Sequence, residues 1–287
     1  MARIVLKARH LIYVEILTMK VSHKLATAAT LSALWVSPVL AITIDGNLAD
    51  WGIDPATWTP SSGIHATIED QTGSGGFYLN PGWGGQAYDA EALYAMFSGG
   101  KLYIALATGH NPATLQKPAN NSYGAGDFAI DFGKDGHYEL GINIVHAGTN
   151  GNADPLTVSG GVYKNPVWNY GLWNSSGAYD PAHPDPAHPT FMQSGTQIGV
   201  ASLAISGPAS GYGSKASDSH YFYEMSLDVS LLYAAGWHNE PLNIHWTMNC
   251  ANDSIIVDPP AYVPEPPSAA LLGMALVGWM GLRRRRV

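Results

Sequence analysis

The feature that most constrains this chain is the absence of any long amphipathic helix pattern between Ile42 and Pro264. No sustained run there places apolar residues at i, i+3, i+4 and i+7. Many short segments instead alternate or are rich in β-branched residues, and they end at Gly, Asn, Asp or Pro. This pattern predicts an all-β domain with strands at 42–44, 66–69, 92–98, 102–108, 128–132, 138–145, 197–205, 221–227, 243–248 and 255–257.

Neighbouring strands are predicted to pair as hairpins at two places. Gly99 and Gly100 join the strands at 92–98 and 102–108, and a Gly-containing turn follows the strand at 128–132. About ten strands in this stretch suit a single antiparallel, jelly-roll-like β-sandwich, because two sheets bury alternating faces without long helices.

Other parts of this stretch are predicted to lie outside the strands. Asp228 and Gly236 have the positions of an N-cap and a stop for one short helix at 228–235. Long stretches rich in Gly, Asn and Ser, at 73–85, 109–126 and 150–194, are predicted to be loops. Loops of such length are uncommon and often functional.

Charge is distributed unevenly along the chain. The stretch 42–264 contains five lysines, no arginine and twenty acidic residues, a net charge of −15, whereas the whole chain carries −8. Nucleic-acid binding needs clustered basic residues, so this charge excludes it as a function. The single cysteine, Cys250, excludes a disulfide scaffold and is expected to be a buried thiol. The abundance of Trp, Tyr and β-branched residues argues against intrinsic disorder.

Residues 1–41 have the layout of a secretory signal peptide with an apolar helix. From Met19, which we take as the true start, basic residues precede a short apolar run. Val39 and Ala41 occupy the −3 and −1 positions of a cleavage site. The layout predicts Sec export and removal by signal peptidase. The alternative is a retained signal anchor, but the apolar run is short for a membrane span of about 20 residues.

Residues 263–287 form a tripartite tail. Pro264, Glu265 and Pro266 precede an apolar run at 268–282, and the tail ends with the basic residues Arg283, Arg284, Arg285 and Arg286. This arrangement resembles the PEP-CTERM sorting signal, which combines such a motif, a hydrophobic transmembrane helix and an Arg cluster. An ordinary single-pass anchor is the alternative, and in both cases the arginines stay on the cytoplasmic side.

The resemblance implies processing by an exosortase near the PEP motif. It also implies a Gram-negative bacterium that makes exopolysaccharide, with the protein at the cell surface or released outside the cell. The C-terminal helix would anchor the protein in the inner membrane until it is processed.

The domain between these ends, 42–262, opens with Ile44-Asp45-Gly46-Asn47-Leu48-Ala49-Asp50-Trp51. This segment resembles the IDG-x-L-x-D-W opening of family-nine-type carbohydrate-binding modules and DOMON-like domains. The resemblance implies a β-sandwich in which the Gly makes a turn and the Trp packs against a sheet. The aromatic residues that hold sugar in those modules have no matched positions here.

Acidic side chains cluster at Glu69 and Asp70, at Asp89 with Glu91, and at Asp127 with Asp131. Calcium prefers carboxylate and carbonyl oxygens, which acidic and Gly-rich loops provide. We therefore take Glu69, Asp70, Asp89, Asp127 and Asp131 as candidate calcium ligands. The alternative is that these carboxylates are simply solvated on a sheet surface.

Aromatic residues gather in or beside the predicted loops, as at Trp58, Trp83, Trp168, Tyr170, Trp173 and Tyr179. Exposed rings form platforms for sugars, so Trp168, Tyr170 and Trp173 are candidate glycan-binding residues. A Trp that fastens a loop onto the sandwich is the alternative.

The predicted function is that of an exported surface or matrix protein without catalytic activity, and binding to an exopolysaccharide is the sharper form of this prediction. One alternative is an extracellular polysaccharide hydrolase that pairs two carboxylates. The sequence has no G-x-S-x-G nucleophile motif. A purely structural surface protein is the other alternative.

Overall fold

The computed structural model describes residues 42–70, 83–145 and 155–264, which form two antiparallel β-sheets. The first sheet has the order β1 (His65–Ile68), β2 (Ala90–Ser98), β3 (Lys101–Thr108), β9 (Tyr221–Asp228) and β8 (Ser202–Ile205). The second has the order β11 (Ser254–Val257), β10 (Leu242–Thr247), β4 (Phe128–Phe132), β5 (Leu140–Ile142), β6 (Gly161–Tyr170) and β7 (Pro189–Val200). The predicted all-β class is confirmed, and the two sheets are consistent with a β-sandwich.

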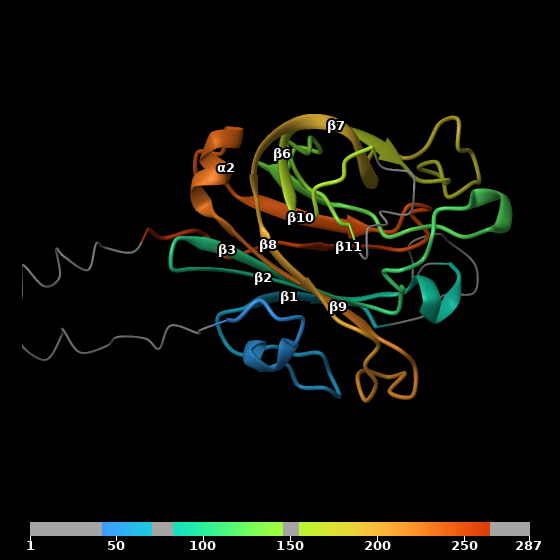
Figure 1. Ribbon diagram of the computed structural model, residues 1–287, viewed down its shortest axis with the longest axis horizontal. Helices are drawn as coiled ribbons and strands as arrows, with labels where there is room; N and C mark the ends of the chain where they lie inside the picture. Colours follow the sequence, from blue (N-terminus) through green and yellow to red (C-terminus); the bar gives the residue numbers. More distant parts are fainter. Residues whose placement is uncertain (1–41, 71–82, 146–154, 265–287) are drawn as a thin grey trace, which may run out of the picture. The chain divides into compact units, whose positions relative to one another are not determined.

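One hydrophobic core joins the two sheets, which lie as layers in Figure 1. It contains Leu93 and Ile104 from the first sheet and Phe128, Ile244 and Trp246 from the second, all fully buried. The helix α2 (Val229–Ala235) closes the core at one end through Leu232. Three short 3-10 helices complete the structure: η1 (Leu48–Trp51), η2 (Gly85–Tyr88) and η3 (Pro118–Asn120).

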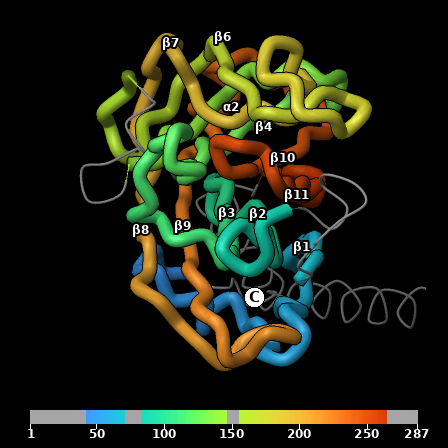
Figure 2. Tube along the Cα trace, turned by 90° about the vertical axis from the view of Figure 1, so that its right-hand side faces the viewer, coloured from blue at the N-terminus to red at the C-terminus, as the bar shows by residue number. Residues whose placement is uncertain are grey.

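A second core covers the outer face of the first sheet. Residues 42–64 lie on the side of β1–β3 that faces away from β10 and β11 (Figure 2). Trp51 and Trp58 pack there against Tyr94 of β2. Gly46 has a φ of +82°, a conformation that favours glycine, and its turn precedes the buried Trp51. Strands β2, β3 and β9 are therefore buried on both faces.

Most predicted strands are present. The hairpin between β2 and β3 turns at Gly99 and Gly100, which have φ values of +56° and +73°, and β4 pairs with β5 as predicted. The predicted helix is confirmed as α2, with Gly236 as its left-handed stop, although the Asp228 side chain bonds Lys101 instead of capping the helix. Cys250 is buried as expected.

Three predictions about strands were wrong. Residues 42–44 form no strand, because this segment lies over the first sheet outside its ladder. The strand predicted at 197–205 is two strands, since the chain leaves the second sheet after β7 and enters the first as β8. The stretch 150–194 is not a single loop as predicted. It contains β6 and the first part of β7, which form the longest pair of strands among the described residues.

Candidate metal centre

Four carboxyl groups from distant parts of the chain gather beside the start of β2. Asp70 follows β1, Asp89 and Glu91 flank Ala90, and Asp253 lies in the turn between β10 and β11. One carboxylate oxygen of each of Asp70, Asp89 and Glu91 lies within 4.8 Å of the other two. Asp253 Oδ2 accepts a hydrogen bond from the backbone N–H of Ala90 at 2.8 Å. We call these four residues the acidic cluster.

A β-bulge at Glu91 shapes the cluster. Ala90 pairs with Thr108 and Ala92 with Ala107, so Glu91 is an extra residue without a partner on β3. The backbone carbonyl of Glu91 accepts hydrogen bonds from the backbone N–H groups of Glu69 (2.8 Å) and Asp70 (3.1 Å). Bulges redirect side chains and occur often at functional sites. This bulge holds the end of β1, with Asp70, against Glu91.

The carboxylates of the cluster have too few hydrogen-bond donors. Glu91 Oε1 accepts hydrogen bonds from Gln86 Nε2 and, at 2.6 Å, from His220 Nδ1, but its buried Oε2 has no donor among the residues that the structure describes. Asp70 Oδ2 accepts the backbone N–H of Ser214 at 2.7 Å, whereas its Oδ1 has no donor in the described part of the chain. Asp89 is 2% exposed, and no N–H or O–H of the described residues donates to either of its oxygens. Among these residues, Asp89 can form a side-chain hydrogen bond with the neighbouring Asp253 carboxyl, and this bond requires one of the two carboxyl groups to be protonated.

Electrostatics favour neutralisation of this site. Burial raises the pKa of Glu91 to about 8. Burial, followed by repulsion from Glu91 and Asp70, raises the pKa of Asp89, and burial raises that of Asp253 well above its usual range. Burial also lowers the pKa of His220 despite its contact with Glu91, so this imidazole is a poor counter-ion. Within the described ranges, the lysine ion pairs lie elsewhere, at Asp228 and Asp258.

The cluster fits a bound calcium ion. Calcium–oxygen distances are about 2.3–2.6 Å, so two ligands on opposite sides of the ion are about 4.6–5.2 Å apart. One oxygen each of Asp70, Asp89 and Glu91 lies within 4.8 Å of the other two, which is close enough for all three to bind one ion. The donors are carboxylate oxygens, which suit a hard cation such as calcium. A dication would also supply the positive charge that the described protein groups do not.

The structure separates the predicted calcium ligands. Asp70 and Asp89 belong to the cluster, and Glu69 adjoins it with a pKa that burial raises. Asp127 lies elsewhere and accepts the backbone N–H groups of Ile144 (2.8 Å) and Met192 (2.9 Å). Asp131 accepts those of Asp135 (3.1 Å) and Gly136 (2.9 Å) and so stabilises a turn. These last two carboxylates bind backbone and are not brought to the cluster.

One member of the acidic cluster, Asp253, and one of its neighbours, His220, were not predicted. Asp253 is 163 residues from Ala90, and His220 is 129 residues from Glu91, so no local spacing relates them. One signal was present for Asp253, because this acid lies in the short polar segment between two predicted strands.

The predicted aromatic residues lie in different settings. The prediction that Trp168 and Tyr170 lie in a loop is wrong. Both residues are on β6, because this strand continues through several register shifts. Trp168 is half-buried, donates from Nε1 to the Tyr138 carbonyl at 3.1 Å and packs against Gly141. Trp58 is fully buried in the second core.

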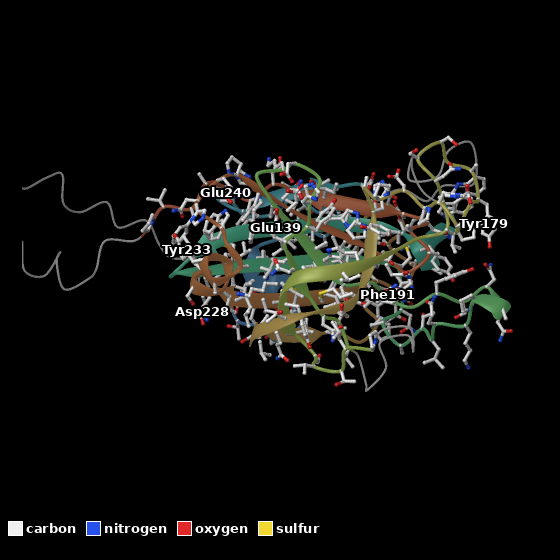
Figure 3. The ribbon with its side chains drawn as sticks, turned by 90° about the horizontal axis from the view of Figure 1, so that it is seen from above. Glu139, Tyr179, Phe191, Asp228, Tyr233 and Glu240 are labelled. Atoms are coloured by element: carbon white, nitrogen blue, oxygen red, sulfur yellow. The ribbon has the colours of Figure 1, made fainter. Side chains whose placement is uncertain are left out.

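Trp173 belongs to an aromatic group that does lie in a loop. Its ring stacks on Trp83, with centroids 6.1 Å apart, and contacts Tyr179 edge-on. Its Nε1 donates to Asn252 Oδ1 at 3.1 Å. Tyr179 is 65% exposed and lies at the opposite end of the domain from Tyr233 of α2 (Figure 3).

The predicted addressing segments lie outside the described residues. These are the signal peptide at 1–41 and the sorting tail apart from its first two residues, so Glu265, Pro266 and the four arginines are not described. Within the part of the chain that is described, no helix is long and apolar enough to span a membrane.

Comparison with known proteins gives no relative. No protein-family model matches the sequence, and no curated protein and no solved structure matches the chain.

Proposed function

We propose that this chain is an exported, non-catalytic protein of the cell surface or extracellular matrix, and that its β domain binds calcium at the acidic cluster. One observation carries the calcium proposal: the buried Asp89 carboxylate lies beside Asp70 and Glu91, and no N–H or O–H within the described ranges donates to either of its oxygens. Buried charges are normally paired or bound to metal, because an isolated buried charge is very unfavourable.

The burial of the cluster supports a binding role over catalysis. A glycosidase places its two carboxyl groups on either side of a substrate bond. Asp89 is 2% exposed and Glu91 is fully buried, so a polymer could not lie between them. This argues against the acidic cluster as the carboxylate pair of the hydrolase alternative.

Export and surface location rest on the sequence. The proposal retains the signal peptide, Sec export, exosortase processing at Pro264-Glu265-Pro266 and a transient membrane anchor through the C-terminal helix. A jelly-roll-like arrangement of the two sheets belongs to the same proposal. Extracellular calcium-binding modules need affinities of only about 10⁻⁴–10⁻³ M, which an exported domain with partial protein ligation can meet.

Calcium titration of the full chain tests the proposal. We expect heat of binding by calorimetry and, at calcium one hundred times above Kd, a stabilisation of about 2.7 kcal/mol. This corresponds to a rise of about 5–10 °C in Tm, which excess chelator reverses. Magnesium, which demands a smaller octahedral site, is the comparison ion and is expected to be weaker.

Two variants make the test specific. Asp89→Asn keeps the shape of the side chain but removes its charge, so calcium should no longer raise Tm. Asp131→Asn, outside the cluster, should keep the full calcium response. An unchanged midpoint in the unaltered protein, or loss of the response in Asp131→Asn alone, would overturn the proposal.

A further inference from the structure

A cleft of about 540 Å³ lies next to the acidic cluster. Its wall includes residues from η2, from the segment after β3, from the segment before β9 and from the start of β9, among them Tyr88, Asn111, Thr114, Ser217, Ser219 and Tyr221. Gln86 also lines the cleft and donates from Nε2 to Glu91 of the cluster. The volume lies within the range of pockets that bind small molecules.

The lining has a distinctive chemistry. Half-buried rings of Tyr88 and Tyr221 stand among hydroxyl and amide groups. Of the described residues that line the cleft, Asp218 is the only Asp, Glu, Lys or Arg. Without a lysine or arginine, the cleft lacks the cations that recognise phosphate, sulfate or carboxylate ligands. Its many polar groups also make it unsuitable for a lipid chain. The ligand that fits is neutral and combines hydroxyl groups with apolar faces.

The cleft is already formed in the structure. His110 at its base is bonded through Nε2 to the carbonyl of Tyr123 at 2.9 Å, and the Tyr88 ring packs on His110 with centroids 5.8 Å apart. Asn111 Oδ1 accepts the backbone N–H of Ala113 at 2.9 Å, which fixes the amide and leaves its N–H₂ group as a donor. Preformed walls reduce the entropy lost on binding.

We propose that this cleft binds a neutral saccharide. The C–H face of a sugar ring would pack on Tyr221 or Tyr88, and its hydroxyls would bond to Asn111, Thr114 and the two serines. This gives the predicted glycan-binding role a place different from Trp168, Tyr170 and Trp173. The proposal needs the cleft alone and does not depend on calcium at the acidic cluster.

The test is a binding screen of the full chain, with calcium present, against neutral oligosaccharides of two to four hexoses. Uronate oligosaccharides of equal length and a lysine-rich peptide form the comparison arms. We expect binding of a neutral member, and weaker or no binding of uronates because Asp218 repels them. Tyr221→Ala should weaken binding about tenfold, the equivalent of about 1.4 kcal/mol.

Further variants locate the site and protect against misfolding. Ser219→Trp places a bulky ring at an exposed cleft position and should abolish binding with an unchanged Tm. Tyr179→Ala, in the Trp173 aromatic group, and Tyr233→Ala on α2 should bind as the unaltered chain does. Asp89→Asn should keep saccharide binding within about threefold, which separates this proposal from the calcium site.

Three outcomes would overturn the proposal. They are no binding of any neutral saccharide, preference for uronates or for the peptide, and loss of binding in Tyr179→Ala but not in Ser219→Trp.

Discussion

Two groups of buried carboxylates in this domain differ in how their oxygens are satisfied. Asp127 accepts two backbone N–H groups, and Glu224 accepts those of Asp45 and Gly46 at 2.9 Å and the indole N–H of Trp51 at 2.8 Å. Asp89, equally buried, accepts from no donor among the described residues. The first two carboxylates bind N–H groups of the protein. The charge of Asp89 would instead have to be neutralised by a bound proton or cation.

The difference teaches that burial of an acid does not identify a metal site. Asp127 and Asp89 are 1% and 2% exposed, and both were candidate calcium ligands from sequence. What separates them is the number of donors that reach each oxygen. A carboxylate whose oxygens accept backbone N–H groups is satisfied by the protein itself and stabilises the fold.

The largest expected effect is that of Asp127→Ala. This change leaves the N–H groups of Ile144 and Met192 without their acceptor, and each unsatisfied buried group costs about 1–3 kcal/mol. The free energy of unfolding should therefore fall by about 2–5 kcal/mol, to the same extent in calcium and in chelator. Urea denaturation measures it. A loss that is larger in calcium than in chelator would place Asp127 in the metal site.

The second prediction concerns pH in the absence of calcium. The folded-state pKa of Glu91, about 8, lies above its unfolded value, so its contribution to stability is complete below about pH 4 and is lost as pH rises toward 8. Histidine side chains of the unfolded chain have a pKa of about 6.5 and are largely deprotonated above about pH 7.5. From about pH 7.5 to about pH 9, stability in chelator should therefore fall by about 1 kcal/mol.

Calcium should remove this loss, because it binds the ionised carboxylates. Thermal melts at the two pH values, with chelator and with calcium, make the comparison. A melting temperature that is independent of pH in chelator would contradict the raised pKa of Glu91.

The smallest effect is expected for Asp131→Ala. Its carboxylate bonds the N–H groups of Asp135 and Gly136, but both residues are exposed, so water can replace the lost acceptor. The free energy of unfolding should fall by only about 0.5–1.5 kcal/mol. Equilibrium unfolding compares it with Asp127→Ala; an equal loss in both would contradict the distinction between exposed and buried donors.

The sequence predicts the strands that alternate cleanly. Strand β4 has the bounds predicted for it, and β2, β3, β9, β10 and β11 differ by only one or two residues. Strand β6 was missed because Asn165, with a φ of +49°, and Pro166 interrupt its pattern. The register of β6 against β7 shifts at these residues, so a bulged pair of strands tolerates them.

The candidate site was predictable only in part. Adjacent acids drew attention to Asp70 and Asp89. Whether an oxygen has a donor depends on contacts such as Ser214 to Asp70, 144 residues apart, which no periodicity shows. For the same reason, the sequence could not distinguish Asp127, whose donors come from two different strand regions, from a metal ligand.

The covering layer at residues 42–64 has a consequence for the order of folding. Gly46 and Glu224, which it joins, are 178 residues apart in the chain. A chain that emerges N-terminus first can pack Leu48 and Trp51 on β2 and β3, but Gly46 and the Trp51 indole lack their Glu224 acceptor until β9 has followed. Closure of this layer is therefore a late, long-range step, and such steps are slow. Any truncation before β9 would leave these apolar side chains as a site for aggregation or for capture by a chaperone.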